Sequence, residues 1–307
     1  MTTAAFLDAT LLARTANLSL LAQRVVEGSL HGLHLSRQLG AGMEFNQYRP
    51  YEPGDDPRQL DWKLYARSDK LFIRQSERES HVKVRVVLDT SASMAQPSND
   101  IDNWTRFDCA RHIAACALAI AERQGDGYGW MGLNAHDRSG LPIGHSKRHL
   151  DRCLVALENA VPQGAWPSET QLDTLWDAFS PPGLVVLISD FYQQRNEVLS
   201  LAQKLRAAGN DVLALQLVTR QEVSFPYRGS TDFLDRETGQ RVQTHARSVR
   251  ERYRLNFEQA HETLRAGLAA HGIALHRATI ETPLDHLLTT FVNARDVVAH
   301  TTRLGAA

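Results

Sequence analysis

The sequence predicts an α/β protein with a mainly parallel central sheet that helices cover on both faces. The first observation is a set of apolar runs, over 82–89, 184–190 and 212–218, that are rich in Val, Leu and Ile. Such near-continuous runs are typical of parallel strands buried on both faces. The second observation is that segments of helical periodicity separate these runs. Strands that alternate with helices favour a parallel sheet between two helical layers.

Each further element follows from its periodicity or its turn residues. Leucines at helical spacing predict an amphipathic helix over 6–27, whereas the three prolines of segment 43–67 exclude a long helix there. The other expected elements, in chain order, are a strand over 71–75, a helix over about 105–123, a strand over about 126–134, helices near 147–160, 170–179 and 194–208, a helix over 246–271, a strand over 273–280 and a final helix through 284–291.

The domain organisation expected from these elements is one large Rossmann-like domain over about 80–295. A β-hairpin is expected as an insert near 222–244, because Asp235–Gly239 has the composition of a tight turn. The N-terminal helix and arm, residues 1–79, are expected to pack on this domain rather than to form an independent one. Residues 296–307 form a tail.

Composition and charge limit the classes of function. The chain has 307 residues, of which 43% are hydrophobic and 22% charged, as in ordinary globular proteins. Its formal net charge of −1 gives no excess of positive charge for phosphate contacts, so no nucleic-acid partner is expected.

The cysteines and the N-terminal segment indicate the compartment. Cys109, Cys116 and Cys153 are an odd number without CxxC spacing, which favours buried free thiols. Charged residues interrupt the apolar residues after Phe6, so no signal peptide is expected there. The sequence contains no long uninterrupted apolar segment, so we expect no membrane span. We therefore expect a cytoplasmic protein.

The most informative motif lies at the end of the first long apolar run, where Asp89, Ser91 and Ser93 follow Val-Val-Leu. One carboxylate and two hydroxyls at this spacing suit a hard cation such as Mg²⁺, whereas zinc prefers His and Cys. A second apolar run ends in Ser-Asp190. Open α/β sheets bind ligands at the carboxyl ends of their strands, where these acids are expected to lie. The alternative is that Asp89 only stabilises a turn or a helix start and that the serines are loop hydroxyls.

The motif Asp89-Thr-Ser91-Ala-Ser93 resembles the metal-ion-dependent adhesion site of von Willebrand factor type A domains. More narrowly, the chain resembles the bacterial family known as domain of unknown function 58, over roughly residues 18–295. The segment from Gly42 to Arg67, the Ser-Asp190-Phe sequence and the Glu237-Thr-Gly239 sequence carry this second resemblance.

This resemblance implies a ligand set and a function. Asp89, Ser91 and Ser93 match the first loop of the adhesion site, Asp190 matches the later acid, and Thr170 is the best match for the remaining threonine. Thr105 and Thr174 compete for that last place. A Mg²⁺ or Mn²⁺ ion held there would dock an acidic side chain of a protein partner. Relatives are associated with MoxR-type AAA+ ATPases, so such an ATPase is the expected partner of a non-enzymatic adaptor.

The arm carries a set of charged and aromatic residues that the resemblance marks as its signature. These are Arg49, Tyr51, Asp55, Asp56, Arg58, Asp61, Trp62 and Arg67. Acids and arginines alternate so closely that ion pairs within the arm are the simplest interpretation. The alternative interpretation is a docking surface for a partner outside the adhesion site.

Two other functions compete with the adaptor hypothesis. A phosphatase of the haloacid dehalogenase type would use Asp89 as nucleophile, but it needs a general acid two residues later, where this chain has Ser91. A scaffold that works without metal is the second alternative. Neither a Walker P-loop nor a GxSxG elbow occurs, which argues against nucleotide hydrolysis and serine-hydrolase chemistry.

Overall fold

The computed structural model describes residues 47–51, 60, 62–68, 70–75, 82–136, 138–173, 179–192 and 197–284, together with 288, 290 and 293. These residues fall into two compact units. The smaller unit comprises the described residues up to 75, and the larger unit comprises those from 82 onward.

The smaller unit contains a two-stranded antiparallel sheet and a short helix. Strands β1 (Gln47–Pro50) and β2 (Phe72–Gln75) pair, and the backbone N–H of Tyr51 extends the pairing by donating to the Leu71 carbonyl at 2.9 Å. Helix α4 (Trp62–Ser68) lies between them in sequence and buries no side chain.

The signature residues of the arm are described only in part. Trp62 is 61% exposed and makes an edge-on contact with Tyr65, and Arg67 is exposed in the last turn of α4. Arg49 contributes its backbone to β1. Tyr51 is half-buried directly after β1. The four remaining residues, Asp55, Asp56, Arg58 and Asp61, lie outside the described residues. The predicted ion pairs of the arm therefore stay a prediction.

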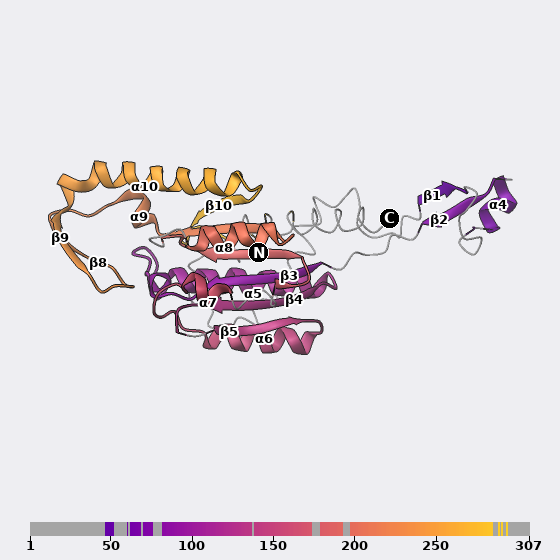
Figure 1. Ribbon diagram of the computed structural model, residues 1–307, viewed down its shortest axis with the longest axis horizontal. Helices are drawn as coiled ribbons and strands as arrows, with labels where there is room; N and C mark the ends of the chain where they lie inside the picture. Colours follow the sequence, from indigo (N-terminus) through magenta and orange to yellow (C-terminus); the bar gives the residue numbers. More distant parts are fainter. Residues whose placement is uncertain are drawn as a thin grey trace. The chain divides into compact units, whose positions relative to one another are not determined.

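The larger unit is built on a six-stranded sheet with the order β10-β7-β6-β3-β4-β5 (Figure 1). Every neighbouring pair is parallel except β4 with β5. This arrangement confirms the predicted mainly parallel α/β architecture. The strand bounds are β3 Lys83–Asp89, β4 Gly127–Leu133, β5 Arg138–Gly144, β6 Leu184–Ser189, β7 Asp211–Val218 and β10 Ala274–Thr279.

Strand β5 is the element of the main sheet that the sequence did not reveal. Its sequence, Arg-Ser-Gly-Leu-Pro-Ile-Gly, lacks the apolar run expected of a buried strand, and it contains Pro142. Proline removes a hydrogen-bond donor, so within sheets it is found mainly on edge strands. The structure places β5 at the sheet edge, where its side chains are exposed or half-buried.

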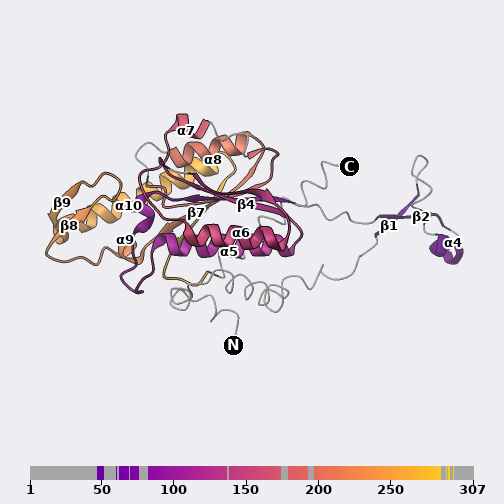
Figure 2. The same cartoon turned by 90° about the horizontal axis from the view of Figure 1, so that it is seen from below.

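Helices cover both faces of the sheet, as predicted (Figure 2). Helices α5 (Arg106–Arg123) and α6 (Lys147–Asn159) pack on one face, whereas α8 (Glu197–Ala207) and α10 (Ala246–Ala269) pack on the other. Strand β3 serves both cores because successive side chains point to opposite faces. Val84, Val86 and Leu88 belong to the core under α5, and Val87 belongs to the core under α8.

Helix α5 is the most deeply buried helix of this unit. It begins with a capping box, in which the Thr105 hydroxyl accepts from the Asp108 N–H and the Asp108 carboxylate accepts from the Thr105 N–H. Cys109 and Cys116 lie in this helix and Cys153 lies in α6, and all three are buried free thiols, as predicted. Burial raises the pKa of Cys116 to about 12, which keeps this thiol protonated at neutral pH.

The hairpin is present, but it is shorter than predicted. Strands β8 (Ser230–Leu234) and β9 (Arg241–His245) pair in antiparallel fashion around the predicted turn. The start of the expected hairpin region instead forms the short helix α9 (Arg220–Ser224). Thr219 and Glu222 form a second capping box there, a local signal that outweighs strand propensity.

No helix among the described residues combines the length and the apolarity that crossing a bilayer requires. The longest, α10, has 24 residues and carries charged side chains along its length.

Candidate functional site

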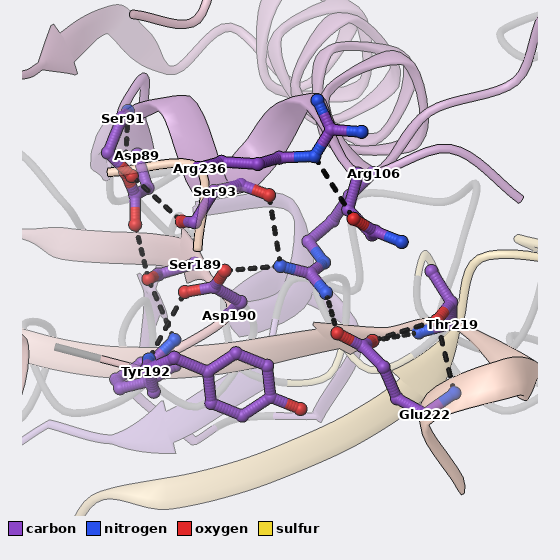
Figure 3. Close-up of polar contacts among 12 residues, drawn as sticks. Asp89, Ser91, Ser93, Arg106, Ser189, Asp190, Tyr192, Thr219, Glu222 and Arg236 are labelled. Atoms are coloured by element: carbon purple, nitrogen blue, oxygen red, sulfur yellow. Dashed lines mark hydrogen bonds and ion pairs between the residues drawn. The ribbon is translucent and has the colours of Figure 1, made fainter. Parts of the chain in front are cut away.

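The candidate site lies where two neighbouring strands of the main sheet end. Strand β3 ends at Asp89, and β6 ends at Ser189, immediately before Asp190. The two strands pair in parallel, with Leu88 opposite Ile188, so their last residues meet at one edge (Figure 3). Both acids are completely buried. The structure thus brings together the two acids that the sequence placed at strand ends.

Asp89 is held by hydrogen bonds from two directions. One carboxylate oxygen accepts from the backbone N–H of Ser91 at 2.9 Å, and the other accepts from the hydroxyl of Ser189 at 2.6 Å. Burial, and then the negative charge of Asp190, raise the pKa of Asp89 to about 7, although these hydrogen bonds act in the opposite direction. A positive charge placed beside Asp89 would favour the ionised form of its carboxyl group.

Ser91 and Ser93 present a pair of hydroxyls beside this carboxylate. Their oxygens lie 3.0 Å apart on the loop that enters the short 3₁₀ helix η3 (Ala92–Ala95). The segment after α6 braces this loop, because the Ala92 N–H donates to the Gly164 carbonyl at 2.7 Å. The predicted first loop of the site is therefore a compact structure, with its hydroxyls beside a buried acid.

Arg106 is the main functional residue that the sequence analysis missed. Its guanidinium forms an ion pair with Asp190 and a second with Glu222, at 2.5 Å, and it donates to the Ser93 carbonyl at 3.3 Å (Figure 3). Burial alone would lower the pKa of Arg106, but the charges of Asp190 and Glu222 raise it above its usual value. The arginine therefore joins three separate segments and neutralises part of the site.

The other oxygen of Asp190 accepts from the Tyr192 backbone N–H at 3.1 Å. Asp190 is thus occupied on one side by Arg106 and on the other by the chain that follows β6. Any cation at Asp89 would share Asp190 with the Arg106 guanidinium.

Thr170 is the residue that was predicted to complete the site from a third segment. Thr170 is exposed in the short helix α7 (Glu169–Asp173), and its hydroxyl lies 3.1 Å from that of Ser168. Of the two competing threonines, Thr105 caps helix α5 and Thr174 lies outside the described residues. The assignment of Thr170 remains a prediction based on the resemblance.

The chemistry of these donors can be compared with that of a bound metal ion. Among the described residues, no group of three or more His, Cys, Asp or Glu side chains is placed to hold a metal. The cluster at the strand ends instead offers carboxylate and hydroxyl oxygens only, from Asp89, Ser91, Ser93 and Asp190. This donor set fits a hard cation with several water ligands, such as Mg²⁺, and does not fit zinc.

Comparisons with known proteins give distant relatives without assigned functions. The chain is 28% identical over 236 residues to the uncharacterized proteins Rv1480 of Mycobacterium tuberculosis and Mb1516 of Mycobacterium bovis, covering 76% of this chain and 73% of each relative. Among solved structures, it is similar to BatB from Bacteroides thetaiotaomicron, with 16% identity, a TM-score of 0.46 and coverage of 71% of this chain and 99% of that one. The SpRpn10 VWA domain gives 12% identity, a TM-score of 0.40 and coverage of 69% and 94%.

A family model supplies the stronger result. The model described as protein of unknown function DUF58 matches residues 47–263, which is more than half of the chain. The match includes both capping boxes, both buried acids and the hairpin. The six-stranded sheet with its antiparallel edge, which the match includes in large part, agrees with the predicted α/β fold with a mainly parallel sheet. The chain therefore belongs to the DUF58 family.

Proposed function

We propose that this protein is a non-enzymatic adaptor that docks an acidic side chain of a protein partner through a divalent cation. The observation that carries this proposal is the meeting of two buried carboxylates, Asp89 and Asp190, with a pair of hydroxyls at the carboxyl edge of the sheet. Parallel sheets of this kind place ligands at that edge.

Asp89, Ser91 and Ser93 would hold the ion, with Asp190 near it and with Thr170 as the remaining expected ligand. When bound, the ion supplies an electrophilic position that a foreign carboxylate fills. The protein residues do the rest. Ser189 and the Ser91 N–H orient the Asp89 carboxylate, and Arg106 fixes Asp190. Three of the expected ligands, Ser91, Ser93 and Thr170, are neutral hydroxyls, and Asp190 is already paired with Arg106, so the ion would keep positive charge for the partner.

Titration of Mn²⁺ against the wild type and Asp89→Ala, followed by calorimetry, tests the metal site. We expect saturable binding to the wild type and at least a tenfold weaker affinity in the variant, because the main charged ligand is lost. Asp232→Ala is the matched control, since Asp232 is an exposed acid on the hairpin. Equal heats from all three proteins would remove the metal from the proposal.

A pull-down with Mg²⁺ or with a chelator then tests the partner. A MoxR-type AAA+ ATPase is the first candidate, on the family resemblance. We expect its capture to depend on Mg²⁺ and to fail in Asp89→Ala. Capture that chelation leaves unchanged would contradict metal-dependent docking.

The ion pair between Arg106 and Asp190 favours a second candidate function, a scaffold that works without metal. The Arg106 guanidinium already supplies positive charge beside Asp190, so this part of the site would not need a cation. In that case the same partner would be retained with and without chelator. The phosphatase alternative has weaker support, since the Ser91 hydroxyl occupies the place of its general acid and lies 3.0 Å from the Ser93 hydroxyl. An assay with p-nitrophenyl phosphate tests it directly.

A further inference from the structure

A cavity of about 500 Å³ lies against the half of the main sheet that ends in β5. Residues of β3, β4 and β5 line it, together with Phe179 and Ser180 of the loop before β6. Arg85 and Val87 place it on the sheet face that carries α8, because alternate residues of a strand point to the same face. Helix α8 contacts β6 and β7 there, and none of its described residues lines the cavity. The cavity therefore lies on the part of this face that α8 leaves uncovered.

Two glycines make room for the cavity. Gly129 lies at the register shift between β4 and β5, where an added Cβ would be 2.7 Å from backbone atoms of Leu141 and Pro142. Gly140 has a φ of +129°, which residues with a side chain rarely adopt. The backbone thus excludes larger residues at both positions, and the space beside them is not filled by side chains from either.

Arg85 brings a charge without a counter-charge to the wall of this cavity. The side chain is buried, and its Nη2 donates to the carbonyls of Ser180 and Pro181. Its Nε and Nη1 have no hydrogen-bond partner within the part of the chain that the structure describes. A guanidinium has five N–H donors and stays charged in proteins, so this one keeps both unused donors and its full charge. Buried charges are normally paired, which makes Arg85 an unusual wall residue unless an anion completes its surroundings.

The other groups around the cavity also suit an anion that has an apolar body. Among the described lining residues, two are charged, Arg85 and Arg138, and neither is acidic. Arg138 is exposed, so it adds positive charge near the entrance. Met131, Ile143 and Phe179 supply apolar surface. Ligand pockets typically have volumes of roughly 300–1,000 Å³, mainly apolar walls and a few polar groups that orient the ligand.

We propose that this cavity binds a small organic anion, with its anionic oxygen group at Arg85 and its apolar body against Met131 and Phe179. A carboxylate or a phosphate would supply the acceptors that the guanidinium lacks, through charge-assisted hydrogen bonds. The unused nitrogens are covered from water, so the Arg85 side chain turns toward the ligand as it binds. The cavity uses none of the expected metal ligands, and the inference is therefore independent of the proposed function.

Calorimetric titration of the full chain, in chelator, tests the recognition of charge. The probes are hexanoate, hexyl phosphate and the neutral hexanamide, which share an apolar chain. We expect saturable binding of at least one anion and at least tenfold weaker binding of the amide. In Arg85→Met, the affinity for the anion should fall at least tenfold while that for the amide stays the same. The matched control is Arg254→Met, which removes an exposed arginine of α10 and should keep the preference for the anion.

Equal affinities of anion and amide in the wild type would overturn the inference, as would a preference that survives in Arg85→Met. Amide chemical shifts of the wild type locate the ligand even if that variant fails to fold. We expect the anion that binds more tightly to move resonances in the segments 129–131, 139–143 and 179–180. Shifts confined to other segments, or no shifts, would make the cavity a packing feature of the edge strand and would overturn the inference.

Discussion

Arg85 and Arg106 are both buried in the larger unit, with 7% and 1% of their surfaces exposed, but their surroundings differ. Arg106 forms ion pairs with Asp190 and Glu222. Arg85 donates through one nitrogen to two backbone carbonyls, those of Ser180 and Pro181, at 3.1 and 2.9 Å. Among the described residues, no carboxylate pairs with Arg85, and its Nε and Nη1 have no hydrogen-bond partner.

The two pKa values move in opposite directions for this reason. Burial lowers the pKa of Arg85, whereas the two neighbouring carboxylates raise the pKa of Arg106 despite its burial. Arg85 therefore holds the Ser180–Pro181 loop through the dipoles of two backbone carbonyls. Arg106 instead balances the negative charges of Asp190 and Glu222. Of these two arginines, only Arg106 joins acids from separate segments.

The largest effect is expected from Arg106→Met. This change leaves Asp190 and Glu222 without their buried counter-charge, which should cost about 3–5 kcal/mol of unfolding free energy. Urea denaturation at pH 7 measures the loss as a lower midpoint at an unchanged slope. Arg220→Ala, which removes an exposed pair with Asp100, is the control and should cost less than about 1 kcal/mol. Equal losses in both variants would show that Arg106 carries no special charge role.

An intermediate effect is expected from Asp89→Asn in metal-free protein, and here the variant should gain stability at high pH rather than lose it. The pKa of Asp89 in the folded protein, about 7, lies above its ordinary value of 3.8. The folded state therefore holds a proton that the unfolded chain releases, so stability from this group is full below pH about 4 and is lost as the pH rises to about 7. Asn has no charge to bury.

The variant should consequently be more stable than the wild type at pH 8, by an amount on the order of 1–2 kcal/mol, and about equal to it at pH 4. Thermal unfolding in chelator at both pH values measures this difference. A variant that is less stable at pH 8 would mean that the ionised carboxylate is well compensated in the folded protein. The favourable charge balance around Arg106 would then include Asp89 as well.

The smallest effect is expected from Arg85→Met. Two hydrogen bonds to carbonyls are lost, but a buried charge without a paired acid disappears with them, so the net cost should stay below about 1 kcal/mol. The same urea series used for Arg106→Met measures it. A loss as large as that of Arg106→Met would break the comparison and would point to an acidic partner for Arg85.

The sheet and its two helical layers could be predicted because their signals are local. The apolar runs that became β3, β6 and β7 each reveal a buried strand within one short segment. Strand β5 could not be predicted, because an edge strand has only one neighbour and tolerates the Gly and Pro that normally exclude a strand. Helix α9 does have a local signal, the Thr219–Glu222 capping box, which the hairpin interpretation overlooked.

The candidate site was predictable to the same extent. Asp89 and Asp190 follow apolar runs, so their place at the sheet edge could be inferred from sequence. The ion pairs of Arg106 could not, since Arg106 and its partners Asp190 and Glu222 come from segments far apart in the chain. The turn at Asp235–Gly239 was predicted, but the contact of its Arg236 with Gln96 depends on how the hairpin folds back.

The carboxylate of Glu222 links the start of a helix to the charge balance of the site. One of its oxygens accepts from the N–H and hydroxyl of Thr219, and the other accepts from Arg106. Fraying of the first turn of α9 would therefore withdraw a counter-charge from Arg106 at the same moment. The hairpin follows α9 directly, so pulling on the hairpin strains that turn. Release of Arg236 from Gln96 and loosening of the arginine network should accordingly occur as one cooperative opening event.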